Sequence, residues 1–93
     1  MAVTVRIPSY LASFAGGRNS LELDGSPATV ADALASLWQL HPALRDRILD
    51  EQGAVRQHIN IFIDGENIRD CGGLGAQARD GAEIVILPAV SGG

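Results

Sequence analysis

The sequence predicts a compact α+β domain in which one main helix packs on one face of a sheet. Several short segments alternate apolar and polar residues, which is the period-2 pattern of half-buried strands, and one longer segment repeats apolar residues at helical spacing. In addition, 46% of the 93 residues are hydrophobic and 19% are charged, a composition that excludes disorder from low hydrophobicity. The order of the elements is strand, strand, helix, strand, short strand, strand.

The first half of the chain is predicted to form two strands and the main helix. Residues 3–7 alternate apolar and polar side chains, and residues 21–24 alternate again after a glycine-rich turn, which indicates a hairpin with a long loop. Thr29 can cap a helix with Asp32 at its third position, and apolar residues then recur at helical spacing until Pro42. We expect the main helix between Thr29 and Pro42.

The middle of the chain is predicted to form a shorter helix and a second hairpin. Residues 42–52 place apolar side chains on one face, and Gly53 would end that helix. Residues 59–63 contain three isoleucines and a phenylalanine and predict a strand, and the Asp-Gly dipeptide that follows favours a tight turn into a short strand at residues 67–69.

The last predicted strand covers residues 83–87 and ends at Pro88, which cannot donate a hydrogen bond to a neighbouring strand. The sequence therefore divides into a globular domain at residues 1–88 and a flexible tail at residues 89–93. Turn residues within 72–81 connect this strand to the second hairpin.

The charge balance and the single cysteine exclude several classes of function. Seven arginines stand against eleven acidic residues, and the net charge of −4 has the wrong sign for a nucleic-acid-binding surface. The apolar runs are strand-sized and the first residues lack a signal-peptide pattern, so we expect a cytoplasmic protein with no membrane partner. Cys71 has no second cysteine with which to pair, and no Cys/His spacing resembles a metal site, so Cys71 is expected to be an ordinary thiol.

The C-terminal tail carries the feature that points to chemistry. From Pro88 to Gly93 the chain can extend on the order of 20 Å, which is enough to enter the active site of another protein. Gly92 and Gly93 have no Cβ, so the terminal carboxylate can pass through a narrow channel. The reactive group would be the carboxylate of Gly93.

The chain resembles the ubiquitin-like β-grasp sulfur carriers, the group that contains molybdopterin-synthase small subunits and the thiamine carrier (the MoaD/ThiS family). The likeness spans the whole chain and is closest to the carriers of actinobacterial cysteine biosynthesis. It rests on the Val-Thr-Val start, the Gly16-Gly17 loop, Asn60-Ile61, Gly72-Gly73-Leu74 and the Ile-Leu-Pro-Ala-Val segment before the final glycines. Ser91 departs from the alanine expected in cysteine-type relatives. The resemblance implies a β-grasp fold with a mixed sheet of four to five strands.

The resemblance also implies the chemistry. The protein would be a co-substrate and not an enzyme, and it would bind no cofactor of its own. An activating enzyme of the ubiquitin-E1 type would use ATP and Mg²⁺ to join the Gly93 carboxylate to AMP, and a sulfur donor would displace AMP to leave a thiocarboxylate. The sulfur acceptor would be a pyridoxal-phosphate-dependent cysteine synthase, followed by a peptidase that releases the cysteine, or a thiazole-synthase-like enzyme or the large molybdopterin-synthase subunit.

The face of the sheet beside the tail is the expected partner-binding surface. Strand alternation places Phe62, Val85 and Leu87 on the side opposite the core isoleucines, where they would form an apolar patch. By resemblance, Pro88, Val90, Ser91 and Gly92 would join them in contacting partner enzymes. The alternative is that a helix or loop covers the patch.

Two other functions are compatible with the same sequence. The protein could be a ubiquitin-like modifier that is attached through Gly93 to lysines of other proteins, although the chain has no lysine with which to form lysine-linked chains of itself. It could also be a β-grasp interaction domain for which the final glycines have no role.

Overall fold

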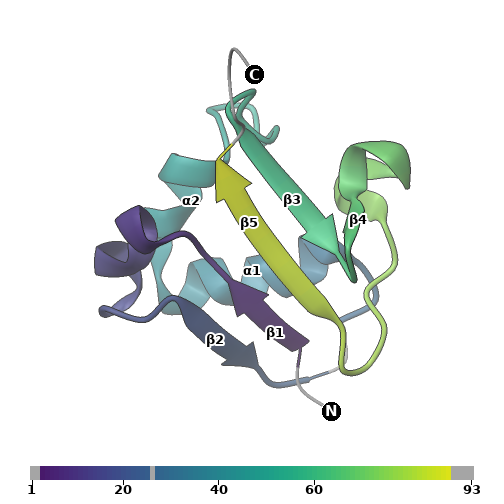
Figure 1. Ribbon diagram of the computed structural model, residues 1–93, viewed down its shortest axis with the longest axis horizontal. Coiled ribbons are helices and arrows are strands. Elements are labelled where there is room, and N and C mark those ends of the chain that lie inside the picture. The colour runs from purple at the N-terminus through teal and green to yellow at the C-terminus, as the bar shows by residue number, and fades with distance from the viewer. Residues whose placement is uncertain (1–2, 26, 89–93) are drawn as a thin grey trace.

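The computed structural model describes residues 3–25 and 27–88, which fold into a five-stranded sheet with helices on one side (Figure 1). The strands are β1 (Val3–Arg6), β2 (Ser20–Leu23), β3 (Ile59–Ile63), β4 (Glu66–Asn67) and β5 (Glu83–Pro88). The helices are α1 (Val30–Leu40) and α2 (Pro42–Ile48), and three 3-10 helices are η1 (Ser9–Ala15), η2 (Ile68–Asp70) and η3 (Gly73–Gly75).

The sheet is mixed, with the strand order β2-β1-β5-β3-β4. The last strand, β5, lies in the middle, where it pairs in parallel with β1 and antiparallel with β3. The β1–β2 and β3–β4 pairs are antiparallel hairpins, as the sequence predicts. The Asp64–Gly65 turn has positive φ at both residues, 49° and 86°, which is the backbone that a two-residue hairpin turn requires.

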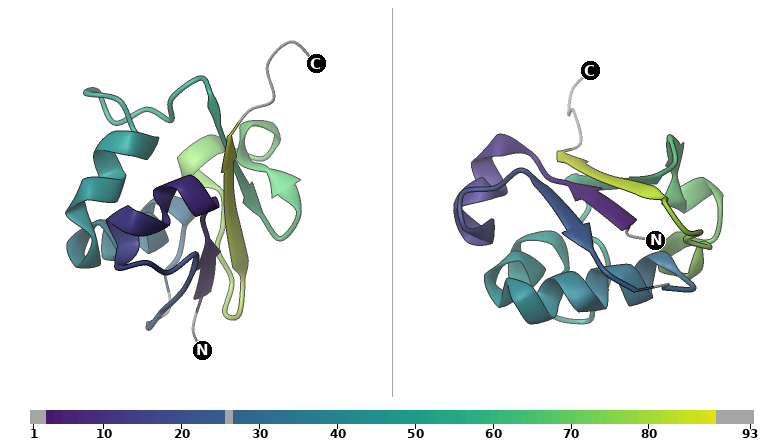
Figure 2. Two further views of the ribbon diagram at one scale, coloured as in Figure 1. Left: turned by 60° about the vertical axis from the view of Figure 1, so that its left-hand side comes forward. Right: turned by 90° about the horizontal axis from the view of Figure 1, so that it is seen from below.

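The helices cover one face of this sheet and leave the other open (Figure 2). Helix α1 begins as predicted, because the Thr29 hydroxyl accepts a hydrogen bond of 3.1 Å from the backbone N–H of Asp32. Val30, Ala33, Leu34 and Leu37 form the buried stripe of the helix, and Trp38 packs against the core from a partly buried position.

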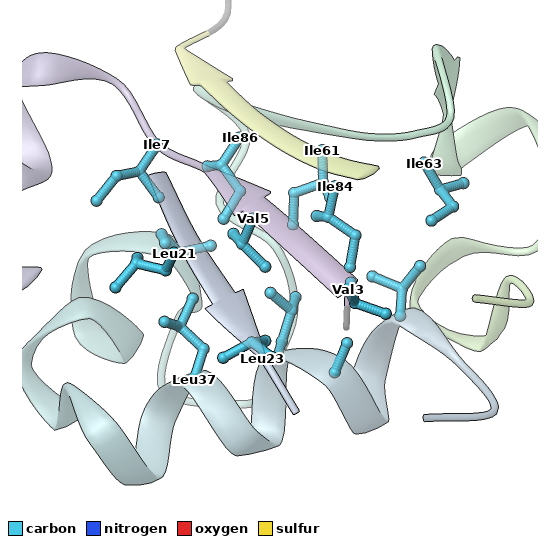
Figure 3. Packing of buried hydrophobic residues seen from close by; sticks show 14 of the residues in the cluster. Val3, Val5, Ile7, Leu21, Leu23, Leu37, Ile61, Ile63, Ile84 and Ile86 are labelled. Carbon is cyan, nitrogen blue, oxygen red and sulfur yellow. The ribbon is translucent and has the colours of Figure 1, made fainter. Parts of the chain in front are cut away.

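The core lies between α1 and the covered face of the sheet, where alternate strand residues point inward (Figure 3). In the two central strands, Ile59, Ile61, Ile84 and Ile86 are at most 1% exposed. Their outward neighbours are therefore assigned to the open face, as the alternation predicts.

Three segments differ from the sequence prediction. Residues expected to be a loop form η1, which buries Leu11 and Ala15. The second helix ends at Ile48 and not near residue 52, because Leu49 is extended and pairs with Val55. The short strand β4 stops at Asn67, whose side chain accepts a hydrogen bond from the N–H of Arg69 and so starts a 3-10 turn.

Over residues 3–25 and 27–88, no helix combines the length and the apolar composition needed to cross a membrane.

Candidate functional site: the end of the last strand and the open face beside it

The predicted site begins where β5 ends. Pro88 is the last residue of the strand and lies opposite Ile59, the first residue of β3. Both Leu87 and Pro88 are exposed, so the chain leaves the sheet at the surface of the molecule (Figure 1). Val90, Ser91, Gly92 and Gly93 lie outside the described residues, and their roles stay predictions from the sequence.

The three apolar residues predicted for the open face do lie together there. Phe62 is directly opposite Val85 across the β3–β5 pair, and Leu87 is two residues further along β5, opposite Asn60. The helices α1 and α2 pack on the other side of the sheet and do not cover them (Figure 2). We call Phe62, Val85 and Leu87 the apolar strip.

The members of the apolar strip differ in exposure. Phe62 and Val85 are half-buried, whereas Leu87 is 43% exposed. The difference follows from the pairing of β5. Val85 has a neighbour on each side, Arg6 in β1 and Phe62 in β3, but β1 ends at Arg6, so Leu87 has a strand neighbour on one side only.

Polar groups border the strip on both sides. Toward β1, the Arg6 guanidinium and the Glu83 carboxylate form an ion pair with an N···O distance of 2.9 Å. Toward β4, the Asn60 side-chain oxygen accepts hydrogen bonds from Asn67 at 3.4 Å and from the Arg69 guanidinium. A partner that covered the strip would therefore meet an apolar centre with charged and amide groups at its rim.

The group around Arg69 was not predicted from the sequence. Its guanidinium also donates to the backbone oxygen of Ile59 at 3.0 Å and to that of Arg56 at 3.4 Å. These partners lie between nine and thirteen residues before Arg69. The one available signal is Asn60, a polar residue within an otherwise apolar strand.

Cys71 lies next to β4, where its thiol donates to the backbone oxygen of Asn67 at 3.5 Å, and it lines an open hollow together with Asp64, Glu66 and Arg79. Desolvation of the thiol, together with the carboxylates of Glu66 and Asp70, raises the pKa of Cys71 above its usual value. A raised pKa disfavours the reactive thiolate at neutral pH. In the described ranges, no three His, Cys, Asp or Glu side chains gather into a group that could hold a metal ion.

Comparison with known proteins identifies the family. Residues 5–93 match the ThiS family. The sulfur carrier protein CysO of Mycobacterium tuberculosis is 34% identical over 95 residues, covering all of both chains. Small archaeal modifier protein 1 of Haloferax volcanii is 40% identical over 84 residues, covering 89% of this chain and 91% of the modifier.

Solved structures agree with this assignment. The chain superposes with a TM-score of 0.87 on a chain from the crystal structure of the Amycolatopsis orientalis BexX/CysO complex, at 38% identity over 99% of this chain and 100% of that one. Mycobacterium tuberculosis CysO gives a TM-score of 0.85 at 32% identity, over 95% and 99% of the two chains. These relatives are small carriers and modifiers that share the mixed sheet described above, and the chain therefore belongs to the ThiS family of ubiquitin-like β-grasp proteins.

Proposed function

We propose that this protein is a sulfur carrier, in which the Gly93 carboxylate is adenylated and then converted to a thiocarboxylate that donates sulfur to a biosynthetic enzyme. The observation that carries the proposal is the course of β5. This strand is the middle strand of the sheet, ends at the surface at Pro88, and is followed in the sequence by five residues that end in Gly-Gly. Full-length similarity to the CysO sulfur carriers supports the same role.

The chemistry explains why activation is needed. A carboxylate is a poor electrophile because it is already negative and its oxygen is a poor leaving group. In the proposed reaction a Gly93 oxygen attacks the α-phosphorus of ATP and pyrophosphate leaves. The sulfur of a sulfide donor then adds to the acyl carbon, AMP departs, and the carbon retains sulfur in place of one oxygen. ATP and Mg²⁺ belong to the activating enzyme, and this chain contributes the acyl group.

The partners follow from the same scheme. The first is an E1-like adenylating enzyme that would dock on the apolar strip and admit the tail to its active site. The second is a sulfur-accepting enzyme, for which we propose a pyridoxal-phosphate-dependent cysteine synthase followed by a peptidase. A thiazole-synthase-like enzyme and the large molybdopterin-synthase subunit are the other candidate acceptors. The Amycolatopsis orientalis CysO was solved in complex with BexX, which supports docking of this fold onto a second protein.

The proposal is tested by intact-mass analysis after incubation with a cognate activating enzyme, ATP, Mg²⁺ and sulfide. We expect a mass increase equal to one oxygen-to-sulfur exchange, located at Gly93 by fragmentation. The matched control lacks Gly92 and Gly93 and should keep its mass. An unchanged mass for the full chain, with an enzyme that loads another carrier, would contradict the proposal.

Attachment to other proteins is a second candidate function, because small archaeal modifier protein 1 is 40% identical to this chain. An activated Gly93 could be attacked by an amine in place of sulfide. Immunoblots of cells that express a tagged protein would then show a ladder of conjugates that disappears when the final glycines are deleted. A single band of the free protein would favour the carrier role.

A further inference from the structure

The end of β5 is held by one neighbouring strand only. β1 pairs with Glu83, Ile84 and Val85 and reaches no further along β5. The three residues that follow pair with β3 alone, Ile86 with Ile61, Leu87 with Asn60 and Pro88 with Ile59. The position from which the tail starts is therefore set by the first three residues of β3.

Those residues of β3 in turn lack a strand on their other edge. β4 is two residues long and pairs with Phe62 and Ile63, beside the opposite end of β3 (Figure 1). Within residues 3–25 and 27–88, no strand pairs with Ile59–Ile61 on the side away from β5.

The Arg69 side chain occupies this open edge. One guanidinium nitrogen donates to the backbone oxygens of Ile59 and Arg56, at 3.0 and 3.4 Å, and the other donates to the side-chain oxygen of Asn60. Arg56 extends the connection, because its guanidinium donates to the backbone oxygen of Asp46 in α2 at 2.8 and 3.1 Å. Arg69 thus supplies hydrogen bonds to this edge in place of a longer β4. Through Arg56, it also connects the edge to helix α2.

We propose that Arg69 is a positioning residue for activation of the tail. Its hydrogen bonds to Ile59 and Asn60, which we call the Arg69 brace, hold the pairing partners of Pro88 and Leu87 in place. The brace thereby sets where the tail leaves the sheet. The inference rests on the proposed carrier function. Reaction at a terminal carboxylate requires the acyl group to reach the α-phosphate of ATP in one orientation, and a displacement of about 1 Å far from the reacting atoms can lower a rate 100-fold.

Binding of the carrier to the activating enzyme and adenylation of Gly93 are separate steps. Their kinetic constants therefore distinguish a docking residue from a positioning residue. Phe62 and Val85 lie where β5 is paired on both sides, and Leu87, which is opposite Asn60, keeps its apolar side chain in the Arg69 variants. Loss of the brace should therefore lower kcat for adenylation, while KM for the carrier changes little.

The experiment compares Arg69→Gln, Arg69→Lys and the control Arg18→Gln, which removes the same charge from an exposed residue between η1 and β2. Hydrogen exchange is measured for residues 59–61 and 86–87, with β1 as the internal reference, and loading is measured as the mass change at Gly93. For Arg69→Gln we expect roughly tenfold faster exchange in those segments and roughly tenfold lower kcat, with KM within about twofold. Arg69→Lys keeps the charge and part of the hydrogen bonding, and should lie between wild type and Arg69→Gln.

Each outcome bears on the inference. Unchanged exchange in residues 59–61 and 86–87 of Arg69→Gln would overturn the brace, whether or not the protein is loaded. Faster exchange with unchanged kcat, or complete rescue by lysine, would overturn the positioning role and leave the carrier function standing. If wild-type protein with normal exchange is never loaded, the carrier function itself fails, and the positioning role fails with it.

Discussion

Truncation of Leu87 tests whether the apolar strip is the docking surface. Leu87 is the most exposed member of the strip and stands directly before Pro88. Complete burial of a leucine side chain contributes about 1.5 to 3 kcal/mol. Since 43% of the residue is exposed, its burial by a partner contributes at most about 0.6 to 1.3 kcal/mol.

That free energy corresponds to a measurable loss of affinity. A change of 1.4 kcal/mol is tenfold in an equilibrium constant, so Leu87→Ala should raise KM for the carrier in the loading reaction, by up to about 3- to 9-fold. The melting temperature should stay close to that of wild type, because exposed side chains contribute little to folding.

Leu40 provides a matched control. It is 61% exposed, more than Leu87, but it is the last residue of α1 on the helical side of the molecule. Leu40→Ala therefore removes the same atoms from a more exposed position and should leave KM unchanged. Equal KM values for wild type and Leu87→Ala, or a larger effect of Leu40→Ala, would refute docking through the open face.

Three further predictions concern the tail, the helix cap and the thiol. Addition of one residue after Gly93 should abolish loading without changing the melting temperature, since the acyl group would no longer be that of Gly93; loading of the extended chain at the wild-type rate would refute Gly93 as the acyl donor. Thr29→Ala removes the hydrogen bond to the N–H of Asp32 and should cost about 1 kcal/mol, or about 4–8 °C in melting temperature, whereas Thr29→Ser should recover most of it. Because the pKa of Cys71 is raised, less thiolate is present at a given pH than for a free cysteine, so alkylation by iodoacetamide at pH 8 should be slower and should increase toward higher pH; alkylation as fast as that of free cysteine would contradict this.

Local sequence patterns predicted the elements whose partners are close in the chain. The Thr29 cap depends on Asp32 three residues away, and the β3–β4 turn depends on Asp64 and Gly65 alone. The second helix was predicted too long because its end depends on pairing with a residue outside the helix. Leu49 continues the apolar face, but its pairing with Val55 draws it out of the helix.

The candidate site was predicted only in part, because some of its features depend on contacts with other elements of the fold. Alternation within β3 and β5 is local, and it placed the apolar strip on the open face. The exposure of each strip member cannot be predicted from local sequence. Leu87 is more exposed than Val85 because β1 ends at Arg6, opposite Val85, and leaves Leu87 without a strand neighbour on that side. The Arg69 brace depends on the length of β4, which ends when the Asn67 side chain starts a turn with the N–H of Arg69. The end of β1 at Arg6 and the end of β4 at Asn67 do not follow from the alternation of apolar and polar residues.

The absence of lysine fits the chemistry proposed for the tail. The chain has seven arginines and no lysine. Among the described residues, five arginine side chains have contacts: Arg6 pairs with Glu83, Arg45 with Asp46, Arg47 lies over the Phe14 ring, and Arg56 and Arg69 donate to backbone oxygens. A guanidinium stays protonated at neutral pH, whereas a lysine has a fraction of free amine that can attack an activated acyl group. A carrier with an adenylated Gly93 therefore meets no side-chain amine on another copy of itself. In the proposed reaction, the activated carbon would then be left to sulfide, or to an amine of another protein.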